Sequence, residues 1–217
     1  PKSPRQTPPI PFGKVGDTMA AGFEKLGWHW WPSDSAIISA PFDGRVACNN
    51  CGPCDIGCTR RAKASTDINY WPKAIAAGAK LEISARVREI TLNPDGTARG
   101  AIFYDADGNV QEQRAKNVVL GCNGIGTPRL LLNSASAMHP DGLSNSSGLV
   151  GKNLMFHPYS IVSGIFDEDM ESYAGPNGCS IISQEFYETD PSRGFVRGYA
   201  FQIARGAGPV TTAQGGM

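Results

Sequence analysis

The stretch NVVLGCNGIGTPRLLLNSAS, residues 117–136, carries most of the information about the fold of this chain. Residues 118–122 are apolar enough to predict a strand that is buried on both faces. The following NGIGTP predicts a tight turn into a helix, with Thr127 as the N-cap and Pro128 as the first helical residue. Such a turn lets a backbone approach a ligand closely, and a helix N-terminus favours an anion. Any α/β protein can contain the same connection, so the pattern alone leaves both interpretations open.

Upstream of this stretch, the hydrophobic pattern alternates with a period of two. Residues 80–92, 99–105 and 110–122 alternate or run apolar and contain many β-branched side chains. The segments NPDG (93–96) and DADGN (105–109) between them favour turns. The sequence therefore predicts a three-stranded antiparallel meander that leads into the buried strand.

Helices are predicted nearer the N-terminus. Residues 17–27 have a helical apolar face, with Asp17 as the cap and Gly27 as the stop. A second helix is expected from Ser65 or Thr66 to Ala77, with a kink or a restart near Pro72. Between them lies WHWWP (28–32), which is interpreted as an aromatic cluster that anchors a loop onto the core or, alternatively, as a platform for sugar stacking.

Beyond the predicted helix of residues 127–136, the chain changes character. Residues 134–150 are typical of a surface loop. The apolar runs at 160–166, 180–187 and 195–204 predict strands of a second, mostly antiparallel sheet. Residues 208–217 are expected to trail off without regular structure.

The totals exclude several classes of protein. Among 217 residues, 20 Lys and Arg balance 20 Asp and Glu, whereas a nucleic-acid-binding protein usually has a basic surplus. No apolar run approaches the ~18 residues of a membrane helix, and the N-terminus does not resemble a signal peptide. The chain opens on proline and a proline-rich segment, which is typical of a linker or surface strap and raises the expectation that the chain is cut from a longer protein.

The segment CNNCGPCDIGC, residues 48–58, contains four cysteines with the spacing C-x2-C-x2-C-x3-C. Two disulfides fit poorly into such short spacings. Structural zinc usually takes two ligand pairs that are a dozen or more residues apart. Ferredoxin-like runs share this spacing, although Thr59 stands where proline usually follows. An iron–sulfur cluster and a loop of free thiols therefore remain the two main alternatives.

Two motifs resemble the glucose–methanol–choline (GMC) family of flavin oxidoreductases. The opening stretch is similar to the second signature of that family through Thr127, Pro128, Leu131 and Leu132. Asn123-Gly124 replaces the usual Gly-Ala, and Ala135-Ser136 replaces the usual Ser-Gly. VGKNLMFHP (150–158) resembles a later family segment through its Gly, Asn, Leu and His. Within the family, the sequence looks most similar to gluconate, sorbitol and related sugar dehydrogenase flavoprotein subunits.

The resemblance implies a fold and a division of the chain. The fold class is α/β (α+β mixed), with part of a Rossmann-like FAD-binding domain that contains the meander and part of an antiparallel-sheet substrate domain. The implied parts are a proline-rich strap, short helix and aromatic loop (1–47), a Cys-rich loop (48–64), a partial FAD-binding domain (65–150) and a partial substrate-binding domain (151–217).

The resemblance also implies cofactor sites. Val87 matches a family valine whose backbone meets the adenine of FAD, and Cys122, Asn123 and Gly124 end a strand beside the FAD ribose and pyrophosphate. Bacterial relatives carry a three-iron cluster (3Fe-4S) on C-x5-C-x3-C. In this sequence Cys48, Cys54 and Cys58 have that spacing, and Cys51 is an extra thiol.

No catalytic residue is expected in this chain. The family removes the hydroxyl proton with a histidine near the C-terminus and binds FAD with an N-terminal G-x-G-x-x-G turn, and neither is present among the 217 residues. His157 is expected to be structural.

The implied function is oxidation of an alcohol group in a sugar, aldonic acid or polyol. Electrons would pass from flavin, with or without a cluster, to a cytochrome or quinone. The alternatives are an iron–sulfur or other metal-binding electron-transfer module without flavin, and a non-catalytic flavoprotein relative. The sequence leaves two compartments open, the bacterial cytoplasm and the periplasm.

Overall fold

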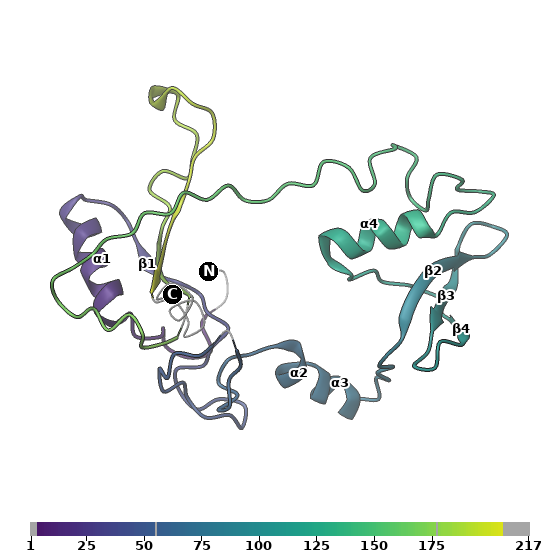
Figure 1. Ribbon diagram of the computed structural model, residues 1–217, viewed down its shortest axis with the longest axis horizontal. Helices are drawn as coiled ribbons and strands as arrows, with labels where there is room; N and C mark the ends of the chain where they lie inside the picture. Colours follow the sequence, from purple (N-terminus) through teal and green to yellow (C-terminus); the bar gives the residue numbers. More distant parts are fainter. Residues whose placement is uncertain (1–3, 55, 177, 206–217) are drawn as a thin grey trace, which may run out of the picture. The chain divides into compact units, whose positions relative to one another are not determined.

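The computed structural model describes residues 4–54, 56–176 and 178–205, which divide into two compact units (Figure 1). The first unit joins the described parts of Pro1–Ala79 and Ser163–Met217, and the second is Lys80–Val162. Helices and two small antiparallel sheets occur together, which confirms the predicted mixed α and β class. In the part of the chain that is described, no helix is long and apolar enough to cross a membrane.

The second unit contains the predicted meander. Strands β2 (Arg86–Leu92), β3 (Ala98–Tyr104) and β4 (Val110–Arg114) pair antiparallel in the order β2-β3-β4. Both predicted turns form, because the amides of Asn93 and Asp105 donate to the carbonyls of Thr97 and Asn109 at 2.9 and 3.0 Å. The local sequence pattern therefore predicted this sheet correctly.

The helix α4 (Asn123–Asn133) packs on β2, as Figure 1 shows. The buried hydroxyl of Ser134, at the end of α4, accepts a hydrogen bond from the amide of Ile90 at 2.9 Å and donates one to the carbonyl of Leu130 at 2.7 Å. Because β2 is an edge strand, this serine satisfies a backbone donor that the sheet leaves open.

Two predictions in this region are wrong. Residues 118–122 form no strand, and Val119 is 91% exposed. A strand needs a neighbour to pair with, and within the described residues no strand lies beside this run. The helix begins at Asn123, so Thr127 and Pro128 lie inside it rather than at its cap and first position.

The first unit is built on a sheet with the order β1-β5-β6, formed by β1 (Trp31–Pro32), β5 (Gly178–Ser183) and β6 (Phe201–Arg205). The helix α1 (Gly13–Lys25) packs against β5 and β6. The core joins these elements through a small apolar cluster with aromatic rings around it: Ala20, Phe23 and Ile181, with Phe12, Met19, Trp28, Trp30, Phe201 and Ile203 packed against them. The tryptophans thus anchor the loop of residues 28–32 onto the core.

Other helix predictions were partly correct. The helix α1 starts at Gly13, and Asp17 lies inside it instead of capping it, because the backbone is already helical over residues 13–16. Gly27, with φ +70°, ends it as predicted. The second helix is split around Tyr70 into α2 (Thr66–Asn69) and α3 (Trp71–Ala76). A short 3-10 helix, η1, spans Pro191–Arg193.

The predicted second sheet is smaller than expected. Of its three predicted strands, 180–187 and 195–204 overlap β5 and β6, whereas residues 160–166 form no strand. The apolar side chains of that run stay exposed, with Ile161 at 88% and Ile165 at 101%. The predicted surface loop at 134–150 contains only turns. The prediction for 208–217 lies outside the described residues.

Candidate functional site

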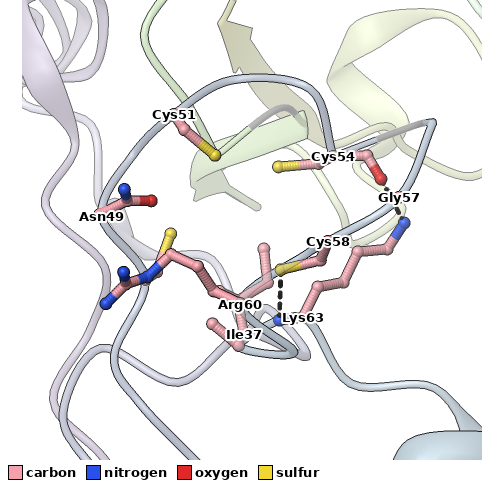
Figure 2. Close-up of a pocket in the computed structure, with 10 residues that line it drawn as sticks. Ile37, Asn49, Cys51, Cys54, Gly57, Cys58, Arg60 and Lys63 are labelled. Carbon is pink, nitrogen blue, oxygen red and sulfur yellow. Dashed lines mark hydrogen bonds between the residues drawn. The ribbon is translucent and has the colours of Figure 1, made fainter.

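Four thiols line one small pocket in the first unit. Cys48, Cys51, Cys54 and Cys58 surround a cavity of about 20 Å³ together with Arg60, other residues of the same loop and Ile37. In Figure 2, the sulfurs of Cys51 and Cys54 point toward one another, and that of Cys58 points into the same space. The four cysteines that stand close together in the sequence therefore also lie close together in the structure.

The backbone holds both ends of the Cys-rich loop to one short segment. The amide of Cys48 donates to the carbonyl of Ile38 at 2.9 Å, and the amide of Ile38 donates to the carbonyl of Ala62 at 3.1 Å. An isolated bridge between Ile37 and Lys63 extends this contact. The loop is thus closed at its base, and its four cysteines line one pocket.

A distant segment of the same unit covers the loop. Gly52 has φ +98°, and a Cβ atom there would lie 2.7 Å from the carbonyl oxygen of Tyr173. The amide of Gly175 donates to the carbonyl of Asn50 at 2.9 Å. Glycine is therefore required at position 52, both for its left-handed backbone and for this close approach.

Hydrogen bonds and burial make the thiols unequal. The amide of Lys63 donates to Sγ of Cys58 at 3.5 Å, and this bond is the main reason that the pKa of the Cys58 thiol is lowered. Burial instead raises the pKa of the Cys48 thiol, although the amide of Asn50 donates to its Sγ at 3.4 Å. Cys58 is therefore the more readily ionised of these two thiols.

Arg205 places a buried positive charge beside this pocket. It is 5% exposed, and its Nε and Nη2 donate to the carbonyls of Pro176 and Pro11 at 3.3 and 2.9 Å. Burial lowers the pKa of its guanidinium, and the charges of Cys48, Asp17 and Cys54 act in the opposite direction. Sequence reasoning missed Arg205, since it lies some 150 residues from the cysteines and matches no motif.

The side chains that line the pocket suit a metal cluster that is bound by cysteine thiolates. Among the described residues that line the pocket there is no histidine or carboxylate, whereas Arg60 and Lys63 supply positive charge. Soft thiolate ligands in one loop suit an iron–sulfur cluster. However, within residues 4–54, 56–176 and 178–205, no three Cys, His, Asp or Glu side chains are arranged to hold a metal ion. The chemistry of the pocket therefore fits such a group, while its sulfurs do not form a closed coordination shell.

The residues expected to contact FAD lie in the second unit. Cys122 is the N-cap residue of α4, and Asn123 and Gly124 form its first turn. Asn123 has φ +59°, and its Oδ1 accepts hydrogen bonds from the amides of Ile125 and Gly126 at 3.1 and 3.3 Å. Oγ1 of Thr127 accepts one from the amide of Cys122 at 3.2 Å. Side chains of the signature therefore hold the start of α4 in place.

A second cavity of about 340 Å³ lies along α4. Gly124, Pro128 and Arg129 line it from the helix, and Gly151 and Lys152 line it from the later family-like segment. The two motifs that resembled one family are therefore neighbours in space.

Val87 lies on β2, 43% exposed, next to a bulge in the pairing of β2 with β3. It does not line the cavity along α4. The structure thus brings Cys122, Asn123 and Gly124 together and places Val87 on the strand against which α4 packs.

Comparison with known proteins supports one family. The family model described as GMC oxidoreductase matches residues 13–159. The chain is 46% identical over 210 residues to 2-methyl-1,2-propanediol dehydrogenase of Mycolicibacterium austroafricanum, covering 96% of this chain and 38% of that protein. It is 37% identical over 166 residues to the fructose dehydrogenase large subunit of Gluconobacter japonicus, covering 73% and 30%. It is 28% identical over 176 residues to paromamine 6'-oxidase of Streptomyces fradiae, covering 76% and 32%.

These relatives are much longer than the chain. It spans 30% to 38% of their lengths, although most of its own residues are matched. The activities in their names therefore belong to longer polypeptides than the one described.

Proposed function

Because the chain belongs to the GMC oxidoreductase family, we propose that it is part of an FAD-dependent dehydrogenase that oxidises an alcohol group of a sugar, aldonic acid or polyol. The observation that carries this proposal is the family match over residues 13–159. Two relatives named as dehydrogenases, one for a diol and one for fructose, support the substrate class.

The residues of this chain that are proposed to bind FAD lie in the second unit. Bound FAD supplies a flavin that accepts two electrons and a proton from the alcohol carbon as a hydride. Cys122, Asn123 and Gly124 would hold its ribose and pyrophosphate region at the start of α4, where the helix dipole favours an anion. Val87 would meet the adenine through its backbone. We place the FAD-binding part at 65–150 and the substrate-binding part at 151–217.

The thiol pocket is the proposed route for electrons to leave. Cys48, Cys54 and Cys58 would hold a 3Fe-4S cluster, which supplies one-electron steps between a two-electron cofactor and an acceptor such as a cytochrome or quinone. The shared pocket supports this ligand set, as do the positive charges of Arg60 and Arg205. Cys51 is the fourth thiol of the pocket and is not one of the proposed ligands.

Iron and sulfide analysis of the full-length enzyme tests the cluster. Cys48→Ser, Cys54→Ser and Cys58→Ser should each lose most of the iron and the cluster's EPR signal, while flavin absorbance persists. Cys51→Ser is the matched control, since it changes a thiol of the same pocket and should retain the iron. Wild-type enzyme with flavin but only trace iron would remove the cluster from the proposal and leave the oxidoreductase standing.

Flavin content and turnover test the oxidoreductase itself. The full-length enzyme should contain about one FAD, and a polyol, an aldonic acid or a sugar should bleach its flavin spectrum in the absence of oxygen. Iron without flavin would instead favour the electron-transfer module, and this result would overturn the proposed function.

A further inference from the structure

A third cavity, distinct from the thiol pocket and from the one along α4, is unusually rich in arginine. It measures about 440 Å³ and lies in the first unit between three segments: residues 43–46, 60–61 and 68–73. Its charged lining consists of Arg45, Arg60, Arg61, Lys73 and Asp43. A cavity of this size can hold a small ligand.

Specific contacts hold these segments around the cavity. Nη1 of Arg45 donates to the carbonyl of Arg61 at 3.1 Å, and Nε of Arg60 donates to the carbonyl of Ala47 at 3.2 Å. Lys73, on α3, pairs with Asp43 at 2.7 Å. These contacts join residues that are 13 to 30 positions apart in the sequence. They hold the loop segments and α3 in place around the cavity.

The charges of the lining do not cancel. Lys73 and Asp43 neutralise one another, and the hydrogen bond from Lys73 holds the pKa of that carboxyl below its usual value. Arg45, Arg60 and Arg61 make no ion pair with any described residue. The lining therefore carries four positive charges and one described negative charge, that of Asp43, which also attracts Arg45.

Two buried polar atoms in the same lining also lack hydrogen-bond partners. They are Nε of Arg45 and Oδ1 of Asn69. A buried donor without an acceptor is costly, and such atoms are uncommon in folded proteins. The side chains of this cavity are therefore not fully satisfied by the described residues alone.

We propose that this cavity binds the phosphate group of a small ligand, either free phosphate or a phosphate ester. The planar guanidinium groups of arginine match phosphate oxygens two at a time. A single carboxylate would neutralise only one of the three arginines, whereas a phosphate dianion neutralises two.

The residues proposed to contact FAD lie in the other unit, and none of them lines this cavity. Arg60 also lines the thiol pocket, so it is a poor choice for a test variant. Arg61 is a better choice, since it is exposed and its side chain makes no hydrogen bond to a described residue.

Calorimetric titration of the full-length, flavin-loaded enzyme with inorganic phosphate tests the proposal, with chloride at equal ionic strength as the reference. Arg61→Gln should weaken phosphate binding by about tenfold or more, the loss expected for a charge-assisted contact. Arg45→Gln with Arg61→Gln should abolish it. Lys25→Gln removes an exposed positive charge from α1 and should bind phosphate as the wild type does.

A parallel titration with glucose 6-phosphate distinguishes a phosphate ester from free phosphate, according to which binds more tightly.

Three results would overturn the proposal. The first is the absence of phosphate binding by wild-type enzyme, as expected if an acidic segment or protein fills the cavity. The second is equal weakening in Arg61→Gln and Lys25→Gln, which indicates general charge attraction. The third is loss of flavin from Arg61→Gln, which would assign the cavity to FAD. Melting temperatures of the variants should match the wild type, so that a folding defect is not mistaken for a binding defect.

Discussion

Removing one hydroxyl group at the end of α4 should loosen the packing of α4 on β2. In Ser134→Ala, the amide of Ile90 loses the acceptor that now lies 2.9 Å away. Both residues are buried, with exposures of 4% and 8%, so water does not replace the lost acceptor without local opening. The carbonyl of Leu130 still accepts a hydrogen bond from the amide of Ser134 at 3.0 Å. The cost therefore comes mainly from one buried, unsatisfied amide.

That cost is about 1–3 kcal/mol, which corresponds to a roughly 5- to 150-fold rise in the opening equilibrium. Hydrogen–deuterium exchange of residues 86–92 in the full-length enzyme measures it directly. Ser136→Ala is the matched control, since the hydroxyl of this exposed serine accepts a hydrogen bond from the amide of His139 in its own turn at 3.2 Å, and its loss should change the exchange of residues 86–92 by less than about 0.5 kcal/mol.

Unchanged protection of the Ile90 amide in Ser134→Ala would refute this reasoning. An equal change in both serine variants would also refute it. Because the other end of α4 carries the residues proposed to contact FAD, Ser134→Ala should also release flavin faster than Ser136→Ala does.

Two further predictions concern the meander. Gly100→Ala should destabilise the protein by about 1–3 kcal/mol in denaturant unfolding, because the new Cβ would overlap the backbone carbonyl of Gln113 on β4; Gly121→Ala, whose Cβ meets nothing within 4 Å, is the control. Asp105 caps the β3–β4 turn, and the hydrogen bond from the side chain of Gln111 is the main cause of its lowered pKa. A depressed folded pKa means that this contribution is complete above the ordinary value of 3.8 and is lost as pH falls through the folded pKa. Exchange of residues 105–109, corrected for its intrinsic pH dependence, should rise in that window, and flat protection throughout would contradict the prediction.

The parts of the fold that sequence predicted are those decided by neighbouring residues. The meander follows from alternation and from two turns, each closed by a hydrogen bond between residues four positions apart. The stop of α1 follows from a single glycine at position 27. Such features need no knowledge of the rest of the chain.

The parts that sequence missed depend on distant partners. Residues 118–122 have the composition of a buried strand, but a strand forms only where another strand pairs with it. The helix α4 starts at Asn123 rather than at Pro128, because Oδ1 of Asn123 accepts hydrogen bonds from the amides of Ile125 and Gly126 while its own backbone is left-handed. A pattern of Asn before a glycine-rich helical start was the available signal.

For the candidate site, spacing alone predicted that the cysteines converge. It did not predict the cover supplied by residues 173–175 or the buried charge of Arg205. Both come from a part of the chain more than 100 residues away, where no local pattern marks them. The arginine cavity was missed for a similar reason, because its lining joins a turn, a loop and two short helices.

The division of the first unit between two separated segments sets an order of assembly during synthesis. Trp31 pairs with Ile182, so β1 must wait for about 150 further residues before its partner strand exists. At ribosomal rates of about 5–20 residues per second, that wait is roughly 8 to 30 seconds. Over this interval the contiguous unit Lys80–Val162 is completed first, while the aromatic side chains of α1 and residues 28–31 have no sheet to cover them. The growing chain therefore exposes this apolar surface early, and β5 and β6, which are made about 150 residues later, supply the side chains of Ile181, Phe201 and Ile203 that pack against it.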